Sequence, residues 1–209
     1  MSDADIRRQL QSKIDEILSE SNHAISESTK SRSSKKSRVV SSDFEDADTS
    51  ETEIDKFNDP EEAFRRLLRL VDIQERSQLQ MRNKLRQKGF SSFAIDAAIE
   101  RAVKANIIND ERFAEMLIAS RVAQGRGFSG IERELKQNGI DPDSIKGWPY
   151  DFGFDENAEV ERAVDLLQSK PPRSKNLRDG AYRKLANKGY SNSVCIKAIR
   201  IWIDHLEEN

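Results

Sequence analysis

The sequence predicts an all-α protein in which three tandem three-helix repeats of about 50 residues form an elongated, curved array after a disordered N-terminal leader. One local pattern recurs at steps of fifty, as KLRQKGFSS at 84–92, ELKQNGIDP at 134–142 and KLANKGYSN at 184–192. From residue 59 onward, apolar residues recur at the spacing of amphipathic helices. Because so small a unit buries its apolar faces poorly by itself, we expect neighbouring repeats to stack and share a core.

The leader, residues 1–58, is rich in Ser, Asp, Glu and Lys and poor in large apolar side chains, so we expect it to be disordered. It holds nine Lys or Arg and thirteen Asp or Glu, whereas the rest of the chain holds 26 and 24. Its segment 43–55 has seven acidic residues and no basic one. The exception is 5–20, where Ile6, Leu10 and Ile14 recur at helical spacing and indicate a short amphipathic helix.

The first repeat is predicted at 59–108. Its expected helices are 61–74, 77–89 and 91–105. A capping box of Ser77 with Gln80 starts the second helix. Gly89 ends it, since glycine adopts a left-handed cap without a Cβ penalty. Ser91 is the expected N-cap of the third helix. Its apolar stripe comprises Ala94, Ile95, Ala98, Ile99, Ala102 and Val103.

The second repeat is predicted at 109–155, with a first helix at 111–123. Ser129 with Glu132 resembles a capping box for the second helix, which Gly139 closes. The third helix is degenerate, because the chain soon enters KGWPYDFGFDEN. We expect the aromatic residues of this insert to cover the apolar surface that the short helix leaves open; stacking on bases or anchoring a protein interface are the alternatives. They are Trp148, Tyr150, Phe152 and Phe154.

The third repeat is predicted at 156–209. Its expected helices are 158–168, 177–188 and 191–206. Cys195 aligns with Ile95 and Ile145, so we interpret it as a small core residue and not as a nucleophile.

Several classes of site are disfavoured by composition. With one Cys and two distant His, no intramolecular disulfide, metal site or catalytic triad can be assembled, so we expect no cofactor. AQGRGFSG resembles a phosphate loop only superficially: it lacks the following Lys-Ser/Thr, so Gly125 and Gly127 indicate a helix–helix turn with positive φ. No run of about 18 apolar residues and no secretory signal is present, which favours a cytoplasmic protein without a membrane segment.

The stretch NDERFAEMLIASRVAQGRGFSGIERELKQNGI, residues 109–140, resembles the central signature of the RecX family of regulatory proteins. An acidic pair precedes Phe-Ala; an Arg, a Gly-rich turn, Ile, Glu-Leu and Gly-Ile follow. These residues are Asp110, Glu111, Phe113, Ala114, Arg121, Gly125, Gly127, Ile131, Glu134, Leu135, Gly139 and Ile140. RSQLQMRNKLRQKGF at 76–90 is similar to the family's first repeat. The resemblance covers roughly residues 60–206.

The resemblance implies three tandem three-helix repeats that bind RecA recombinase in the groove of the RecA–single-stranded-DNA filament. It also implies inhibition of RecA's ATP hydrolysis, strand exchange and stimulated repressor cleavage, in DNA repair and the SOS response. The same resemblance implies a regulator that is not an enzyme. We therefore expect a monomer whose partner is the RecA filament, with single-stranded DNA as a further possible contact. The long leader and the degenerate third helix of the second repeat depart from the family pattern.

Basic residues of the repeats are the candidate contacts with acidic RecA surface or DNA phosphates. They are Arg82, Arg86, Lys88, Arg121, Arg126, Arg133, Lys136, Arg183, Lys184 and Lys188. Arg126 stands out, because a short turn exposes it at its tip. The alternative is that these cations form ordinary solvated helix faces balanced by Glu and Asp. Two other functions also remain open: a helical scaffold for a different protein partner, and a direct nucleic-acid binder, which the near-neutral repeats disfavour.

Overall fold

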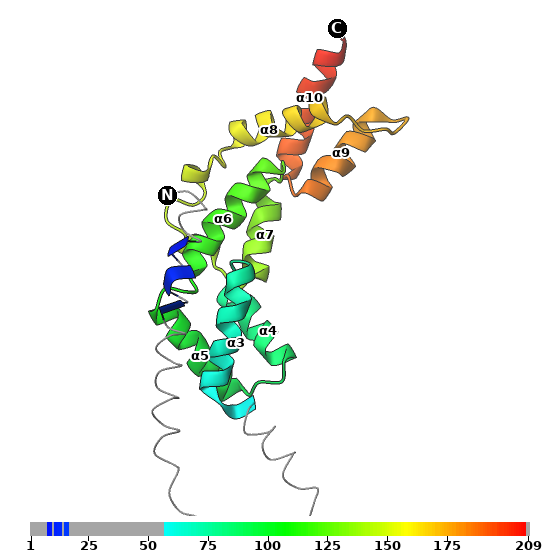
Figure 1. Cartoon of the computed structure of the whole chain (residues 1–209). Helices are drawn as coiled ribbons and strands as arrows, with labels where there is room; N and C mark the ends of the chain where they lie inside the picture. Colours follow the sequence, from blue (N-terminus) through cyan, green and yellow to red (C-terminus); the bar gives the residue numbers. More distant parts are fainter. Residues whose placement is uncertain (1–7, 10, 14, 17–56, 208–209) are drawn as a thin grey trace, which may run out of the picture. The chain divides into compact units, whose positions relative to one another are not determined.

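The computed structural model describes residues 8, 9, 11–13, 15, 16 and 57–207, and every regular element among them is helical (Figure 1). This confirms the all-α prediction. The chain divides into two compact units, Met1–Asn109 and Asp110–Asn209. Most of the predicted disordered leader lies outside the described residues; those described within the expected helix at 5–20 are helical and exposed. The division into three repeats and the curvature of the array stay predictions.

Unit 1 contains α3 (Pro60–Ile73), α4 (Gln78–Gln87) and α5 (Ser92–Lys104). Side-chain oxygens cap all three. Asp59 accepts from the N–H of Glu61 at 2.9 Å, and Ser77 accepts from the N–H of Gln80 at 3.2 Å. Ser91 does the same for α5, as predicted. These caps satisfy backbone donors that a helix start leaves without an intrahelical acceptor.

The core of unit 1 forms where α3 and α5 pack together with residues of α4. Its α3 members are the apolar residues at helical spacing: Ala63, Phe64, Leu67, Leu68 and Val71. The stripe predicted for α5 is buried with one correction, Val103, which is 39% exposed because it lies at the edge of the buried face. Phe57, which composition assigns to the leader, packs edge-on against Phe90 at 5.7 Å between ring centroids. Its carbonyl accepts from the Ser91 N–H at 3.0 Å.

Unit 2 contains these helices: α6 (Asp110–Ala123), α7 (Phe128–Gln137), the 3₁₀ turns η1 (Pro142–Ser144) and η2 (Tyr150–Phe152), α8 (Glu156–Ser169), α9 (Leu177–Lys188) and α10 (Asn192–Glu207). The two 3₁₀ turns occupy the place of the helix that the sequence predicts to be degenerate. Asp141 caps η1 through its carboxylate, and Pro142 follows at the first position. Pro at that position suits a helix start, because its missing N–H has no intrahelical acceptor there.

Two separate apolar clusters fill unit 2, one around α6 and α7 and one around α8, α9 and α10. The expectation of a core shared by neighbouring repeats is therefore wrong within this unit. The aromatic insert closes the first cluster: Trp148 stacks on Phe128 at 5.3 Å and contacts Phe154 at 5.2 Å. Tyr150 does not take part and is 76% exposed. Cys195 is buried in the second cluster.

The pattern that recurs at steps of fifty marks the same local structure three times. Leu85, Leu135 and Leu185 are each fully buried. The glycine four residues after each has a positive φ, +93°, +76° and +86° in chain order. The residue after each glycine is also buried: Phe90, Ile140 and Tyr190. In each case the leucine packs, the glycine turns the chain and the next side chain returns to the core.

A direct backbone contact joins α7 to α9. The Gly127 N–H donates to the carbonyl of Lys188 at 3.0 Å, and the Gly130 N–H donates to that of Gly189 at 3.1 Å. A Cβ on Gly189 would lie 2.3 Å from the Gly130 Cα, which excludes every side chain at this position. We call these four residues the glycine contact. Through it, N–H groups at the start of α7 donate to carbonyls at the end of α9, and helix ends are where such groups commonly lack a partner within their own helix.

The glycine contact corrects two sequence predictions. Gly125 has the expected positive φ of +66°, but Gly127 has a φ of −81°. Gly127 is instead required by proximity, because a Cβ there would lie 2.7 Å from the Tyr190 Cα. The predicted capping box of Ser129 with Glu132 does not form, since α7 begins at Phe128 with Gly127 as its N-cap. A partner from α8 takes over the capping, as described below.

Within residues 57–207 and the few described residues before them, no helix combines the length and apolarity needed to cross a membrane.

The glycine contact predicts unequal costs for alanine at two left-handed glycines of unit 2. Gly153→Ala should cost ~1 kcal/mol, because its φ is +71° while the added Cβ meets no atom closer than 3.6 Å. Gly189→Ala should cost a further 1–3 kcal/mol or so, because its Cβ also collides with backbone. Urea unfolding followed by tryptophan fluorescence measures both, since Trp148 and Trp202 lie in this unit. Equal losses would contradict a tight contact.

Candidate functional site

Side chains of α7 and α9 line a groove in unit 2 with a volume of about 340 Å³. Its lining residues are Arg126, Gly130, Arg133, Glu134, Gln137, Ala186, Asn187 and Gly189. The groove lies along the glycine contact, where the absence of side chains on Gly130 and Gly189 lets the two helices meet. Longer polar side chains surround that contact. Such a lining suits a partner group that carries charge or forms hydrogen bonds.

Arg126 and Arg133 are the two cations of the groove. Arg133 is exposed on α7. Arg126 lies in the α6–α7 turn as predicted, but it is half-buried and not exposed at the tip. No residue that the structure describes forms an ion pair with either one. Arg126 is close enough to Glu134 to help lower the pKa of that carboxyl. Both guanidinium groups therefore keep donors for a ligand outside the chain.

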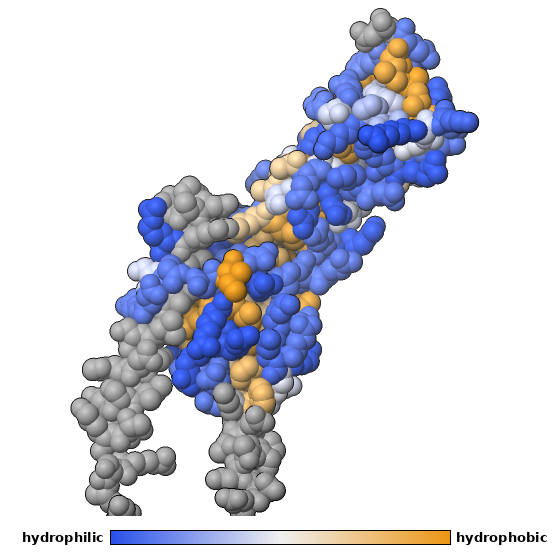
Figure 2. All heavy atoms as spheres, turned by 45° about the vertical axis from the view of Figure 1, so that its right-hand side comes forward, coloured by the Kyte–Doolittle hydropathy of each residue, from blue (hydrophilic) through white to orange (hydrophobic). Residues whose placement is uncertain are grey.

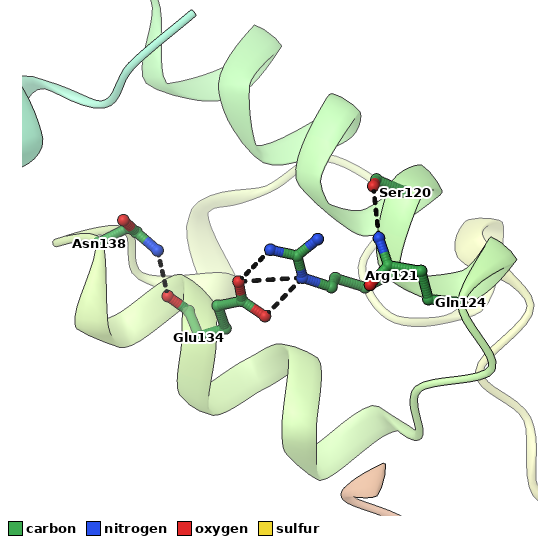
Figure 3. A network of polar contacts seen from close by, with 5 residues as sticks. All are labelled: Ser120, Arg121, Gln124, Glu134 and Asn138. Atoms are coloured by element: carbon green, nitrogen blue, oxygen red, sulfur yellow. Dashed lines mark hydrogen bonds and ion pairs between the residues drawn. The ribbon is translucent and has the colours of Figure 1, made fainter.

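Arg121, another candidate, is held by Glu134 in a bidentate ion pair (Figure 3). The Arg121 Nε lies 2.8 Å from Oε2 of Glu134, and its Nη2 lies 2.6 Å from Oε1. The hydrogen bond from Arg121 lowers the pKa of Glu134, and the same bond raises the pKa of Arg121. Asn138 donates to the Glu134 carbonyl at 2.7 Å, and a separate bond joins Gln124 to Ser120 at the end of α6. This geometry gives Arg121 the structural role of tying α6 to α7.

Four further candidates also have partners inside the chain. Arg82 pairs with Asp96, and Lys136 pairs with Glu132 at 2.6 Å. Lys184 donates to the carbonyl of Lys170 at the end of α8. Lys188 donates to the carbonyl of Gln124 at 3.0 Å, at the end of α6. An ammonium group at a helix C-terminus is stabilising, because it meets the negative end of the helix dipole.

The remaining candidates are Arg86, Lys88 and Arg183, and all three are exposed. Arg86 makes only a long bond of 3.4 Å to Asn83, while Arg183 uses its Nε to reach the Asp179 carbonyl at 3.3 Å. Arg86 and Lys88 belong to unit 1. Of the ten predicted contacts, the structure thus brings Arg126 and Arg133 together at one groove, with Arg121 behind them.

Sequence reasoning missed Glu159, a carboxylate that is 6% exposed beneath the start of α7. Its Oε1 accepts from the Phe128 N–H at 2.6 Å, which caps α7 in place of the predicted serine. Burial raises the pKa of Glu159; the bond from Phe128 and the charge of Arg162 oppose that rise. Nothing in the sequence marks Glu159, because its partner is 31 residues away and other acidic residues flank it on α8.

In the part of the chain that the structure describes, no three His, Cys, Asp or Glu side chains lie in positions to share a metal ion.

Comparison of the chain with known proteins identifies its family. Residues 63–101 match the model of the first three-helix domain of RecX, and residues 109–146 match that of the second. Regulatory protein RecX of Haemophilus influenzae (strain PittEE) is 38% identical over 111 residues, which cover 53% of this chain and 71% of the relative. This chain belongs to the RecX family. Regulatory protein RecX of Mycobacterium sp. (strain JLS) is 28% identical over 171 residues, 76% of this chain and 92% of the relative.

Solved RecX structures share the fold. The crystal structure of RecX from Lactobacillus salivarius has a TM-score of 0.56 at 19% identity, covering 71% of this chain and 97% of that one. A second crystal structure, of regulatory protein RecX, has a TM-score of 0.55 at 18% identity, covering 76% and 80%. The match to the second RecX domain contains α6, α7 and η1, and therefore both groove arginines.

The buried carboxylate predicts a pH-dependent stability with a definite sign. Glu159→Gln keeps an oxygen that accepts from Phe128 but removes the charge. Because the pKa of Glu159 is higher in the folded than in the unfolded state, its protonation contributes to stability. The contribution is complete at pH values below the unfolded-state pKa and is lost as pH rises through the folded-state pKa. The free energy of unfolding of the wild type minus that of the variant should therefore fall as pH rises. Urea titrations by tryptophan fluorescence at several pH values measure it.

Glu156→Gln, on the same helix, is the matched control. Its hydrogen bond from Lys197 lowers the pKa of Glu156, so the corresponding difference should fall as pH drops. The effect should be smaller, because this ion pair is half exposed and solvent screens it. The same sign for both variants would refute the assignment of Glu159.

Proposed function

We propose that this RecX-family protein binds RecA recombinase and its filament on single-stranded DNA, and that it lowers RecA's recombinase, ATPase and coprotease activities in DNA repair and the SOS response. The observation that supports this best is the pair Arg126 and Arg133 at the α7–α9 groove. Both lie in the segment that matches the second RecX domain. Two guanidinium groups that no described residue holds in an ion pair are suited to bind carboxylates or phosphates in a bidentate manner.

The surface also favours distributed polar contacts. Figure 2 shows a mostly hydrophilic face in which apolar side chains form smaller areas. Residues 59–209 are close to neutral overall, with 26 basic and 24 acidic residues. Affinity in this proposal comes from many shallow contacts with a filament and not from one deep pocket. The protein acts as a cytoplasmic monomer without catalytic chemistry of its own.

A helical scaffold for another protein is the alternative function. A pull-down on ATP-loaded RecA filaments, with and without DNA, distinguishes the two. Capture by RecA supports the proposal, whereas a pull-down that recovers a different partner and no RecA favours the scaffold.

The proposal predicts inhibition at substoichiometric amounts. Adding the purified protein to RecA on single-stranded DNA should lower ATP turnover, because one molecule docked on a filament affects several RecA subunits. A steady-state ATPase titration measures this. An unchanged rate across a wide titration would rule the activity out.

The groove predicts a charge-reversal effect. Arg126→Glu with Arg133→Glu should abolish inhibition of RecA ATPase, since two donors to acidic groups become two repelling charges. Helix content by circular dichroism should stay as in the wild type. The matched control is Lys146→Glu with Arg200→Glu, two exposed cations of the same unit that do not line the groove. Full inhibition by the groove variant, or equal loss in the control, would exclude this groove as the contact.

A further inference from the structure

An excess of positive charge outside the groove lies on the α8–α9 loop and α9. Residues 170–188 hold seven Lys or Arg and one acidic residue, Asp179. That carboxylate accepts a hydrogen bond from Asn176, whose Nδ2 lies 2.6 Å from Oδ2 of Asp179. This segment lies outside both stretches that match RecX domain models. Its charge therefore needs an explanation of its own.

Some cations elsewhere in the described residues are neutralised by a neighbour. Lys104 pairs with Glu100, and Lys197 pairs with Glu156, at 2.6 and 2.7 Å. By contrast, Arg173, Lys175 and Arg178 are exposed, and no described residue forms an ion pair with any of them. Like charges held together without counter-charges repel one another and favour a polyanionic ligand. The lowered pKa of Lys184, due first to burial and then to Lys170 and Lys188, agrees with such crowding.

The loop that presents these cations is fixed against α9. A Cβ on Gly180 would lie 2.7 Å from the Ser174 Cβ and 3.0 Å from the Pro172 Cβ, so the loop packs directly on the helix backbone. Lys184 binds the Lys170 carbonyl at the start of the loop. Asn176 accepts from the Asp179 N–H at its end. A loop held at both ends loses little conformational entropy when it binds a ligand.

An aromatic ring completes this surface. Tyr182 is 41% exposed and lies four residues after Arg178, on the same side of α9. Its hydroxyl donates to Oδ1 of Asn192 at 3.2 Å, which fixes the ring. Exposed aromatic rings beside cations are the usual arrangement for binding single-stranded nucleic acid, in which bases stack while cations hold the backbone. An acidic peptide would use the cations but would gain little from the ring.

We propose that Arg173, Lys175, Arg178 and Tyr182, the α9 surface, bind single-stranded nucleic acid directly. The three cations contact phosphates, and one base stacks on Tyr182. This deepens the proposed function, in which the chain acts on a filament that contains single-stranded DNA, and it rests on that function for its biological setting. The binding itself requires no RecA.

The test measures fluorescence anisotropy of a labelled oligo-dT of about 20 nucleotides, long enough to cover such a surface, titrated with the full chain over a range of salt. Arg173→Gln with Lys175→Gln and Arg178→Gln should reduce the slope of log affinity against log salt by about 2, since each phosphate contact on single strands contributes about 0.7. The matched control is Arg65→Gln with Lys104→Gln and Lys197→Gln, three cations paired within the chain. It removes the same net charge and should leave the slope unchanged.

Tyr182 separates nucleic acid from other polyanions. Tyr182→Leu should weaken oligo-dT binding about tenfold, within the range for loss of one stacked base. Tyr182→Phe should bind like the wild type, because it keeps the ring. A wild-type slope in the triple-Gln variant, or an equal fall in its control, would overturn the proposal. Unchanged affinity in Tyr182→Leu, together with displacement of the oligonucleotide by polyglutamate, would overturn it in favour of an acidic protein partner. Neither result bears on the RecA ATPase titration, so the two proposals fail separately.

Discussion

The architecture of unit 2 depends on one close approach of two backbones, the glycine contact between α7 and α9. It permits two hydrogen bonds between helix ends, which apolar packing alone would keep apart. The separate apolar clusters on either side are consistent with this, because helices that meet through backbone do not need a common core. The groove follows from the same contact: where two side chains are missing, the polar residues around them define a hollow. Fold and candidate site therefore have one physical cause.

The cations of this protein fall into two classes, those with a partner in the chain and those without a counter-charge among the described residues. Burial does not distinguish the two classes. Some cations satisfy the chain itself, as Arg121 does with Glu134 and as Lys188 does at the end of α6. Others have no counter-charge among the described residues, notably Arg133 and Arg178. A near-neutral total conceals this division, because net charge records how many charges exist but not which are already paired. The functional proposals above rest on the unpaired class.

Local sequence rules predicted the helices well, because caps and periodicity act over a few residues. Ser77, Ser91 and the recurring glycines behave as their types predict. Two of the failures, at Gly127 and Ser129, involve distant partners. Gly127 is required by Tyr190, 63 positions on, and not by its own φ. Ser129 is no cap, because Glu159 supplies that acceptor from another helix. The sequence also does not predict which cations are held in ion pairs, because pairs such as Arg82 with Asp96 join different helices.

Phe57 has a consequence for where the chain can be shortened. A form that begins at Pro60 would keep every helix from α3 to α10, so a trim at that helix boundary looks harmless. It would nevertheless remove the ring beside Phe90 and the carbonyl that accepts from Ser91. The turn between α4 and α5 would then expose apolar surface and an unbonded amide to water. The packing of unit 1 therefore begins before α3, at an aromatic side chain in a segment that composition alone would discard.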